Sequence, residues 1–502
     1  MAQNNSSYDS YNDKREIIKP EFIGLLILLA IPIVLILVSV LEKPIIILIS
    51  VGLIAAIVLV IAIFKNPTVG IFFILLVAPL DKFRLFISQP ISFNLKLIHI
   101  FLFITLIAWL FKILVSGKPY FIIDRKLTIL ITILFLAFGL SVLMALDSRD
   151  SMEVLLQRLL LLSILIAIVN HIKAFKDLQR GSQFLIAGAL FSVGYGIFQM
   201  IGFYSGFNTD IPFLANLPQV ESYRLGLKVS AGVPRMNSFI NDPNVYGAYL
   251  LAILGLTISL FLTHYQRERR ISTKYLLILL PLTIALIATV SRSAILGFGV
   301  MLLILWFYFR KQLFKPRLFL IGILAILSFV ALINFTQVGQ SFLGRMFGEG
   351  GASQASTNAH LNYAKTAMDM IKARPITGVG LGGYIEYVTR FINPNATTGM
   401  THSMYLTLLA ETGPLSFLAV ILIIFYLWVM LGKLIKHTIA QPEMRAQLIG
   451  WRAFLLGFAV SSIFYSYLSY EFIWVFLGLI VASILIAKKT VFQEQYQYEE
   501  SH

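Results

Sequence analysis

Three short stretches of this 502-residue chain combine a residue capable of chemistry with the start of an apolar run. Arg235 lies in VPRMNSFINDPNVYGAY, Arg292 in TVSRSAIL and His402 in THSMYLTLLAETG. An arginine guanidinium binds phosphate oxygens through two parallel hydrogen bonds. A neutral histidine can take a proton from a hydroxyl group near physiological pH. These residue types fit chemistry on a substrate that carries phosphate.

Helix-start signals accompany all three residues. Asp242 followed by Pro243 is an N-cap with proline at the first helical position. Thr401 or Ser403 can cap the helix that follows His402, and the turn before Arg292 is almost absent. Helix N-termini carry partial positive charge and unpaired N–H groups, which suit anions. We therefore expect three N-termini at one surface of the protein.

A structural interpretation of the same residues stays open. Arginines at the ends of membrane helices commonly extend their charge to lipid headgroups without a specific role. A single histidine outside the membrane is more often hydrogen-bonded at the surface than catalytic. His360, at the start of an amphipathic segment, is a weaker candidate than His402.

The composition shows what kind of element must position these residues. The chain is 58% hydrophobic and 13% charged, with mean hydropathy +0.85. Soluble proteins carry about 25% charged residues, and a spanning helix needs about 20 apolar ones. We predict an all-α polytopic membrane protein with about 12–14 transmembrane helices and a long helical extracytoplasmic loop. The apolar runs are 22–41, 44–64, 68–80, 95–115, 127–146, 154–172, 183–202, 245–263, 275–290, 293–309, 317–334, 404–431, 453–470 and 472–487.

Lysine and arginine positions predict the orientation. With the N-terminus in the cytoplasm, most of the 40 Lys and Arg fall in short inner loops, as the positive-inside rule expects. The net charge of +16 then reflects topology and indicates no nucleic-acid partner. The predicted organisation is a cytoplasmic polar tail (1–21), a single transmembrane helical domain (22–487) and a cytoplasmic C-terminal tail (488–502). Loops 203–244 and 335–403 are extracytoplasmic. Cysteine is absent, which removes thiolate chemistry.

Loop 335–403 contains a predicted amphipathic helix over 359–373. Its apolar stripe is Leu361, Ala364, Met368 and Ile371, and its polar face is Lys365, Asp369 and Lys372. Lys365 and Asp369 have the i,i+4 spacing of an ion pair. Such a helix could lie at the membrane interface, cap a cavity, or pack on the outer face of the bundle.

Several other residues nearby are unusual for a membrane protein. Gly378 and Gly380 lie in TGVGLGGY, which lacks a dinucleotide fingerprint and favours tight turns or close approach of backbone to a ligand. Glu411 lies in a membrane helix, where a charge is costly without a partner or a role. Gly413-Pro414 predicts a kink in that helix. No cluster has the spacing of a metal site, so we expect no metal and no cofactor.

The order of these motifs resembles the bacterial O-antigen ligase and O-antigen polymerase superfamily of membrane glycosyltransferases. The resemblance rests on Pro375, Gly378, Gly380, His402, Tyr405-Leu406, Glu411 and Gly413. Upstream, RMNSFINDPNVYGAYL resembles the family's Arg…Asn-Pro-Asn element, with Asp242 between Asn241 and Pro243, and TVSRSAIL resembles its Ser-Arg element. The family usually has Asn after the histidine, whereas this chain has Ser403.

The resemblance implies an inverting, metal-independent glycosyltransferase in the bacterial inner membrane, with a GT-C-like bundle of helices. The donor would be a glycan on undecaprenyl pyrophosphate, and the acceptor a glycan or lipid A-core sugar on the extracytoplasmic face. His402 would be the catalytic base, and Arg235 and Arg292 would hold the pyrophosphate. Supporting residues would be Asn241, Asn244, Tyr405, Glu411, Gly378 and Gly380. Membrane lipids are expected partners, and nucleic acid is not.

Other functions remain possible from the residues alone. A polysaccharide-lipid flippase or transporter would show paired halves and charges in mid-helix positions. A peptidoglycan-type polymerase would use an outer carboxylate, for which Glu386 or Asp242 could serve. Within the superfamily, the sequence does not separate O-antigen or exopolysaccharide polymerase from O-antigen ligase.

Overall fold

The computed structural model describes residues 44–86, 95–117, 122, 124–207, 209, 227–230, 233–335, 343–344, 351–395 and 401–500. The predicted tail 1–21 and apolar run 22–41 lie outside the described residues. The chain divides into two units, Met1–Asn66 and Pro67–His502. In the first unit, α2 (Pro44–Lys65) is one uninterrupted helix over the predicted run 44–64. The site described below belongs entirely to the second unit.

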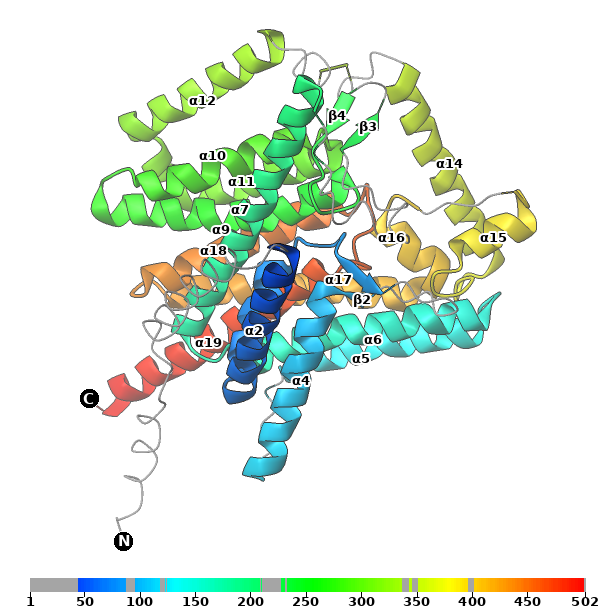
Figure 1. Cartoon of the computed structure of the whole chain (residues 1–502), viewed down its shortest axis with the longest axis horizontal. Helices are drawn as coiled ribbons and strands as arrows, with labels where there is room; N and C mark the ends of the chain where they lie inside the picture. Colours follow the sequence, from blue (N-terminus) through cyan, green and yellow to red (C-terminus); the bar gives the residue numbers. More distant parts are fainter. Residues whose placement is uncertain are drawn as a thin grey trace. The chain divides into compact units, whose positions relative to one another are not determined.

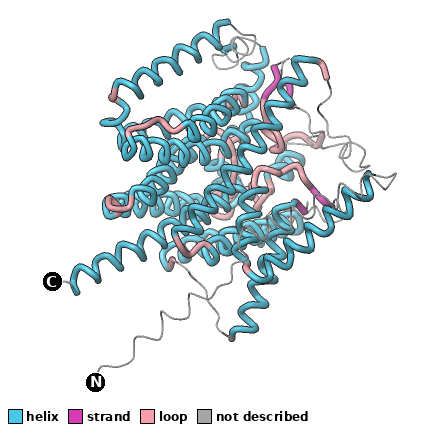
Figure 2. The backbone as a smooth tube through the Cα atoms, turned by 60° about the vertical axis from the view of Figure 1, so that its left-hand side comes forward, coloured by secondary structure: helices cyan, strands magenta, loops and turns pink. Residues whose placement is uncertain are grey.

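Helices make up most of the second unit, so the predicted all-α class is confirmed (Figures 1 and 2). They are α3 (Pro67–Val77), α4 (Leu97–Ser116), α5 (Arg125–Leu143), α6 (Ser148–His171), α7 (Phe175–Ser205), α9 (Pro243–Glu268), α10 (Thr273–Ala288), α11 (Arg292–Leu313), α12 (Pro316–Phe335), α14 (Gly351–Ala373), α15 (Tyr384–Phe391), α16 (Met404–Thr407), the π-helix η2 (Leu408–Thr412), α17 (Gly413–His437), α18 (Pro442–Ser461) and α19 (Glu471–Glu500).

Two short antiparallel strand pairs interrupt the helices. β1 (Arg84–Phe86) pairs with β2 (Leu95–Lys96). β3 (Lys228–Ser230) pairs with β4 (Val233–Arg235), and Lys228 lies opposite Arg235. The second pair falls in the predicted long loop 203–244 and fixes the backbone that leads to Arg235.

Eight of the described helices are long and apolar enough to cross a membrane. They expose many large apolar side chains, such as Leu143 at 75% and Leu114 at 72%. A soluble protein rarely exposes large apolar patches, whereas lipid covers them. The chain is therefore a multi-pass membrane protein. Fewer helices of spanning length are described than the predicted 12–14. One reason is that α3 and α10, with 11 and 16 residues, are shorter than a spanning helix.

The predicted span 453–470 is wrong in its position. The helix runs earlier, over Pro442–Ser461, and residues 462–470 form an irregular segment before α19. This segment is apolar because of its tyrosines and phenylalanine, but its backbone is not helical, and its polar groups bond to the ends of the two neighbouring helices. The Tyr467 hydroxyl lies 2.8 Å from Ser461 Oγ, and Trp474 donates to the carbonyl of Leu468. Hydropathy alone cannot separate such a segment from a helix end.

Helices α9 and α19 form the centre of the bundle, because 89% and 83% of the residues in their apolar stretches are buried. Glycines allow the helices around α9 to approach closely. A Cβ on Gly255 would lie 3.1 Å from the carbonyl oxygen of Gly450 in α18. A Cβ on Gly297 in α11 would lie 2.6 Å from that of Gly457. This close packing fixes the N-terminal ends of α9 and α11 relative to α18.

A buried ion cluster lies under the loop that follows β4. Lys96 Nζ contacts Glu471 Oε1 at 2.8 Å and Asp81 Oδ1 at 2.5 Å. The neighbouring Lys82 donates from Nζ to the carbonyl of Ser238 at 2.9 Å. The cluster therefore joins the start of α19 and the β2–α4 junction to the loop that carries Arg235.

Candidate functional site

One cavity of about 500 Å³ brings together the three residues singled out in the sequence. Arg235 comes from β4, Arg292 from the start of α11 and His402 from the segment before α16. Further walls come from α14 and from the irregular segment 462–470. The remaining lining residues are Asn244, Val290, Ser293, Leu296, His360, Leu361, Ala364, Thr401, Ser403, Leu406, Ile463 and Phe464.

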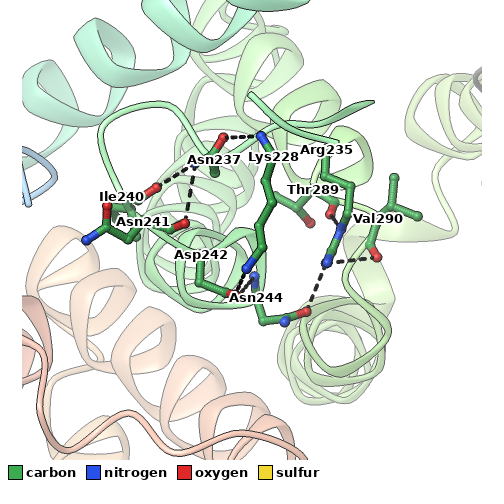
Figure 3. A network of polar contacts seen from close by, with 9 residues as sticks. All are labelled: Lys228, Arg235, Asn237, Ile240, Asn241, Asp242, Asn244, Thr289 and Val290. Atoms are coloured by element: carbon green, nitrogen blue, oxygen red, sulfur yellow. Dashed lines mark hydrogen bonds and ion pairs between the residues drawn. The ribbon is translucent and has the colours of Figure 1, made fainter. Parts of the chain in front are cut away.

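The guanidinium of Arg235 is held by the protein itself. Its Nε donates to the carbonyl of Thr289 at 2.9 Å, and Nη2 donates to Asn244 Oδ1 at 3.0 Å and to the carbonyl of Val290 at 3.3 Å (Figure 3). The side chain is only 5% exposed. These bonds fix the plane of the guanidinium in a buried setting and still leave it lining the cavity.

The turn between α10 and α11 is built around these bonds. Val290 has φ of 47°, which is a strained conformation for a β-branched residue. Strain of this kind persists only where the surrounding structure imposes it. Here the turn directs two successive carbonyls, those of Thr289 and Val290, at Arg235.

The start of α9 forms as its sequence predicts. Asp242 is the N-cap and accepts from the backbone N–H of Asn244 at 2.7 Å. Its carboxylate also pairs with Lys228 Nζ at 3.0 Å across the β3–β4 hairpin. Burial opposes the charge on Asp242, but Lys228 and the helix N–H outweigh it and hold the pKa of the carboxyl below its ordinary value. The pair locks the hairpin onto α9.

Arg292 differs from Arg235 because no described residue accepts a hydrogen bond from its guanidinium. It is the first residue of α11, whose N-cap Ser291 accepts from the backbone N–H of Ala294 at 3.3 Å. Within the part of the chain that the structure describes, its guanidinium makes no hydrogen bond or ion pair. A helix N-terminus and an uncommitted guanidinium together favour an anion at this wall of the cavity.

His402 lies among three aromatic rings. The ring centroids of His360, Tyr363 and Tyr465 are 4.3, 5.2 and 5.4 Å away. Its Nδ1 atom is buried and has no hydrogen-bond partner among the described residues. Burial lowers the pKa of His402 to about 4, and the nearby His360 adds to the effect. The imidazole is therefore neutral at physiological pH and able to accept a proton.

Helix α14 forms one wall of the cavity, as the cavity alternative for the predicted segment 359–373 expects. His360, Leu361 and Ala364 line the cavity. The buried face contains Ala367 and Met370, whereas Met368 of the predicted stripe is 46% exposed. The stripe is therefore rotated from the predicted one. The ion pair also differs, because Asp369 lies 3.8 Å from Lys372 instead of pairing with Lys365.

His360 is the residue whose importance the sequence understated. Its ring is the nearest to His402, and burial and the charge of Arg292 lower its pKa. The only sequence signal for His360 was its position at the start of a predicted amphipathic helix. Its proximity to His402 depends on how the long loop folds back, which spacing does not reveal.

Five of the predicted supporting residues lie outside this cavity, and Asn244 alone lines it. The Tyr405 hydroxyl donates to the carbonyl of Ala459 in α18 at 2.8 Å. Gly378 and Gly380 pack against the chain, since Cβ atoms there would lie 2.2 Å from the carbonyl carbon of Glu411 and 2.6 Å from Ala145 Cβ. Asn241 accepts a 3.5 Å bond from Asn237 through its carbonyl, and Glu411 lines a separate cavity.

The two carboxylates offered for a peptidoglycan-type polymerase also lie elsewhere. Glu386 pairs with Arg390 on α15, and Asp242 is occupied with Lys228 and the α9 N-terminus. Neither residue lines the cavity. The arrangement does not favour a carboxylate base at this site.

Comparison with known proteins gives one family match. No curated protein matches the chain. Residues 276–421 match the family model described as O-antigen ligase. The matched segment contains Arg292, His360 and His402, and Arg235 lies before it. The chain is thus a multi-pass membrane protein with a segment that matches the O-antigen ligase family model, and this segment contains the two histidines and one arginine of the cavity.

Proposed function

We propose that the chain is an inverting glycosyltransferase that moves a glycan from a polyprenyl pyrophosphate to a sugar acceptor. The family match supports a role as a membrane glycan ligase or polymerase. The observation that carries the proposal is the cavity where Arg235, Arg292 and His402 meet although they are far apart in the chain. The cavity offers cationic groups for a leaving group and a neutral base for an acceptor.

In the proposed reaction the pyrophosphate of the donor binds the guanidiniums of Arg292 and Arg235, which both line the cavity. The acceptor hydroxyl donates to His402 and gives up its proton as its oxygen attacks the anomeric carbon. The bond from that carbon to the pyrophosphate oxygen breaks, and the electron pair stays on the leaving group. Fixed cationic donors stabilise the charge that develops there.

The same cavity supports a mechanism without a divalent ion. Its described lining residues include two arginines and no carboxylate. Magnesium binds mainly through carboxylates and phosphate oxygens, so this protein surface offers it no anionic ligand. The guanidiniums and the α11 N-terminus would supply the positive charge instead.

We further propose that the protein lies in a bacterial inner membrane with the cavity on the extracytoplasmic face and both termini in the cytoplasm. Clustering of the Lys and Arg in the opposite loops supports this orientation. The donor would be undecaprenyl-pyrophosphate-linked, and the acceptor would be a growing repeat unit or lipid A-core.

Reconstitution in liposomes tests the proposal. Purified protein is incubated with lipid-linked repeat units in EDTA, and the products are separated on a gel. We expect longer lipid-linked glycans, or a glycosylated lipid A-core when that acceptor is added. The His402→Ala variant should lose the activity, whereas His437→Ala, at the far end of α17, should keep it. Equal activity of wild type and His402→Ala would disprove the mechanism.

Deletion in the native host separates the two transferase activities. Loss of the length ladder with single repeats remaining indicates a polymerase. An undecorated core with lipid-linked polymer accumulating indicates a ligase. Lipid-linked repeats trapped on the inner leaflet would instead support a flippase and contradict the proposal.

A further inference from the structure

A second cavity, of about 270 Å³, shares two chain segments with the first, the one around α16 and the one after α18. Ser403 and Leu406 line the first cavity, and Thr407 and Leu408 line the second. The segment after α18 is shared in the same way, with Ile463 in the first cavity and Ser466 in the second. One helical turn therefore separates the two spaces.

Arg158 is the most unusual residue in this second cavity. It lies within the apolar helix α6, and its Nη2 donates to Ser469 Oγ at 2.7 Å. That bond is the only one its guanidinium makes among the described residues, although the group has five N–H donors. A guanidinium in a membrane helix is costly unless its donors are used. Four donors thus remain for a ligand.

Glu411 supplies the opposite hydrogen-bonding capacity. Its Oε2 accepts from the backbone N–H of Gly382 at 3.0 Å, which fixes the carboxylate against the glycine-rich turn. The structure shows no ion pair between Glu411 and Arg158, so neither neutralises the other by direct contact. The backbone N–H of Tyr384 also bonds to the Glu411 carboxylate, and because a carboxylate has about four acceptor sites, about two remain for a ligand.

Neutral polar and apolar groups complete the walls. Gln157 adds an amide, and Ser466 and Thr412 add hydroxyls. Phe138, Leu468 and Tyr470 provide apolar faces. The cavity thus combines charged donors, charged acceptors and flat apolar surface around a small volume.

We propose that this second cavity binds one sugar residue of a glycan substrate. Sugar hydroxyls donate and accept at once, so they match a guanidinium facing a carboxylate. One arginine beside a carboxyl group offers an anion less than the two arginines of the first cavity, which has no carboxyl group among its described lining residues. The volume is close to the lower end of ligand pockets, about 300 Å³, which suits one ring and not a long chain.

The inference rests on the proposed transferase function, because it assigns the cavity to a substrate of that reaction. The sugar could belong to the donor glycan or to the acceptor. Both present the same hydroxyl chemistry, and only their linkage to the reacting atoms differs. The test therefore has a binding arm that needs no transfer and a kinetic arm that separates the two sources.

In the binding arm, purified protein in nanodiscs is titrated with two probes. One is the oligosaccharide released by mild acid from the host's own surface glycan, and the other is sugar-free undecaprenyl pyrophosphate. Arg158→Gln and Gln157→Ala should weaken oligosaccharide binding about tenfold or more, since a hydrogen bond to a charged group is lost in the first. Binding of undecaprenyl pyrophosphate should stay unchanged in both.

Arg149→Gln is the matched control, because Arg149 lies on the same helix with its side chain 76% exposed. Gln157→Ala decides the result if Arg158→Gln fails to fold. Wild-type affinity for the oligosaccharide in the folded variants would overturn the inference.

The kinetic arm measures KM for donor and acceptor separately in the transfer assay. A higher KM for the donor alone assigns the sugar to the donor glycan, and a higher KM for the acceptor alone assigns it to the acceptor. Unchanged KM for both overturns the inference. Absence of transfer by wild-type protein would refute the proposed function, whereas the binding arm would still report on the cavity.

Discussion

At the scale of single residues, the cavity holds its two arginines in different ways. Arg235 donates hydrogen bonds to Thr289, Val290 and Asn244, so the protein fixes the orientation of its guanidinium before any ligand binds. Arg292 has no hydrogen bond of this kind among the described residues and stands at a helix N-terminus. Arg235 therefore combines a structural and a binding role, and Arg292 is available for binding alone.

This difference predicts that replacing one arginine lowers the stability of the protein and that replacing the other does not. Arg235→Gln should lower the free energy of unfolding by roughly 1–3 kcal/mol, because it leaves buried carbonyls unpaired. Arg292→Gln should leave stability unchanged and should weaken donor binding. Thermal unfolding in detergent and titration with undecaprenyl pyrophosphate measure the two effects. Equal destabilisation by both variants would contradict the assignment.

His402 predicts a specific pH dependence of transfer. The base must be neutral, and its pKa of about 4 keeps it neutral well below the ordinary range of histidine. We expect kcat/KM to stay level as the pH falls from about 7.5 to about 5.5, instead of declining near 6.5. The bound pyrophosphate is negative and favours the protonated imidazole, so the acid limb of kcat should lie at higher pH than that of kcat/KM.

Stopped-time assays over this pH range, in a mixed buffer of constant ionic strength, check the prediction. The His402→Gln variant, whose side chain has no titratable nitrogen, should show no acid limb in its residual rate. An acid limb of kcat/KM centred at about 6.5 in wild-type protein would show that an ordinary histidine limits the reaction.

At the scale of elements, the glycine run and the π-helix act as one unit. Gly378 donates from its backbone N–H to Arg374, and the N–H groups of Val379 and Gly380 donate to the carbonyls of Ala410 and Glu411. The helix break predicted at Gly413 takes the form of η2, with Gly413 at φ of 77°. The unit fixes α16, whose two sides face the two cavities.

Gly378 gives the test of this unit. It has φ of 69°, and a Cβ there would lie 2.2 Å from the carbonyl carbon of Glu411. Gly378→Ala should therefore lower the free energy of unfolding by more than about 1 kcal/mol. Gly139→Ala in α5 is the matched control, since no atom lies within 4 Å of its added Cβ. Thermal unfolding of both variants in one detergent makes the comparison, and equal midpoints would exclude the packing role.

At the scale of the whole molecule, the charge excess and the apolar exterior describe a protein arranged around a bilayer. The net charge is +16, yet the helices also expose many large apolar side chains, mainly leucine, isoleucine and phenylalanine. The cavity lies at the N-terminal ends of α11 and α16, away from the basic C-terminal end of α11 at Arg310 and Lys311. This separation supports the proposed orientation.

The absence of cysteine allows a direct test of that orientation. Asn393→Cys places a thiol after α15, near the proposed extracytoplasmic side, and Thr273→Cys places one at the start of α10 on the other side. Both positions are exposed. A membrane-impermeant maleimide should label Asn393→Cys in intact right-side-out spheroplasts. It should label Thr273→Cys only after lysis, and the reverse pattern would invert the topology.

Much of the architecture follows from the order of residues in the sequence. Apolar runs of spanning length predict the helices, because the bilayer core allows few other elements. Local signals also predict the start of α9 and the break in the helix at Gly413, since Asp242 with Pro243 and Gly413 with Pro414 act over one turn of chain. The order of short motifs predicted the family segment that residues 276–421 match.

The tertiary structure decided what the spacing could not. Arg235 and Asn244 meet the Thr289–Val290 turn, and His360 reaches His402, because long loops fold back over helix ends that close packing has fixed. Local sequence pattern carries no information on such contacts. Hydropathy also placed α18 too late in the chain, because the aromatic segment 462–470 that follows the helix is as apolar as the helix itself. The sequence by itself thus determined the membrane class and the chemical groups. The packing of α9, α11 and α18 decided which groups share the cavity at Arg292 and which, like Glu411, face the second one.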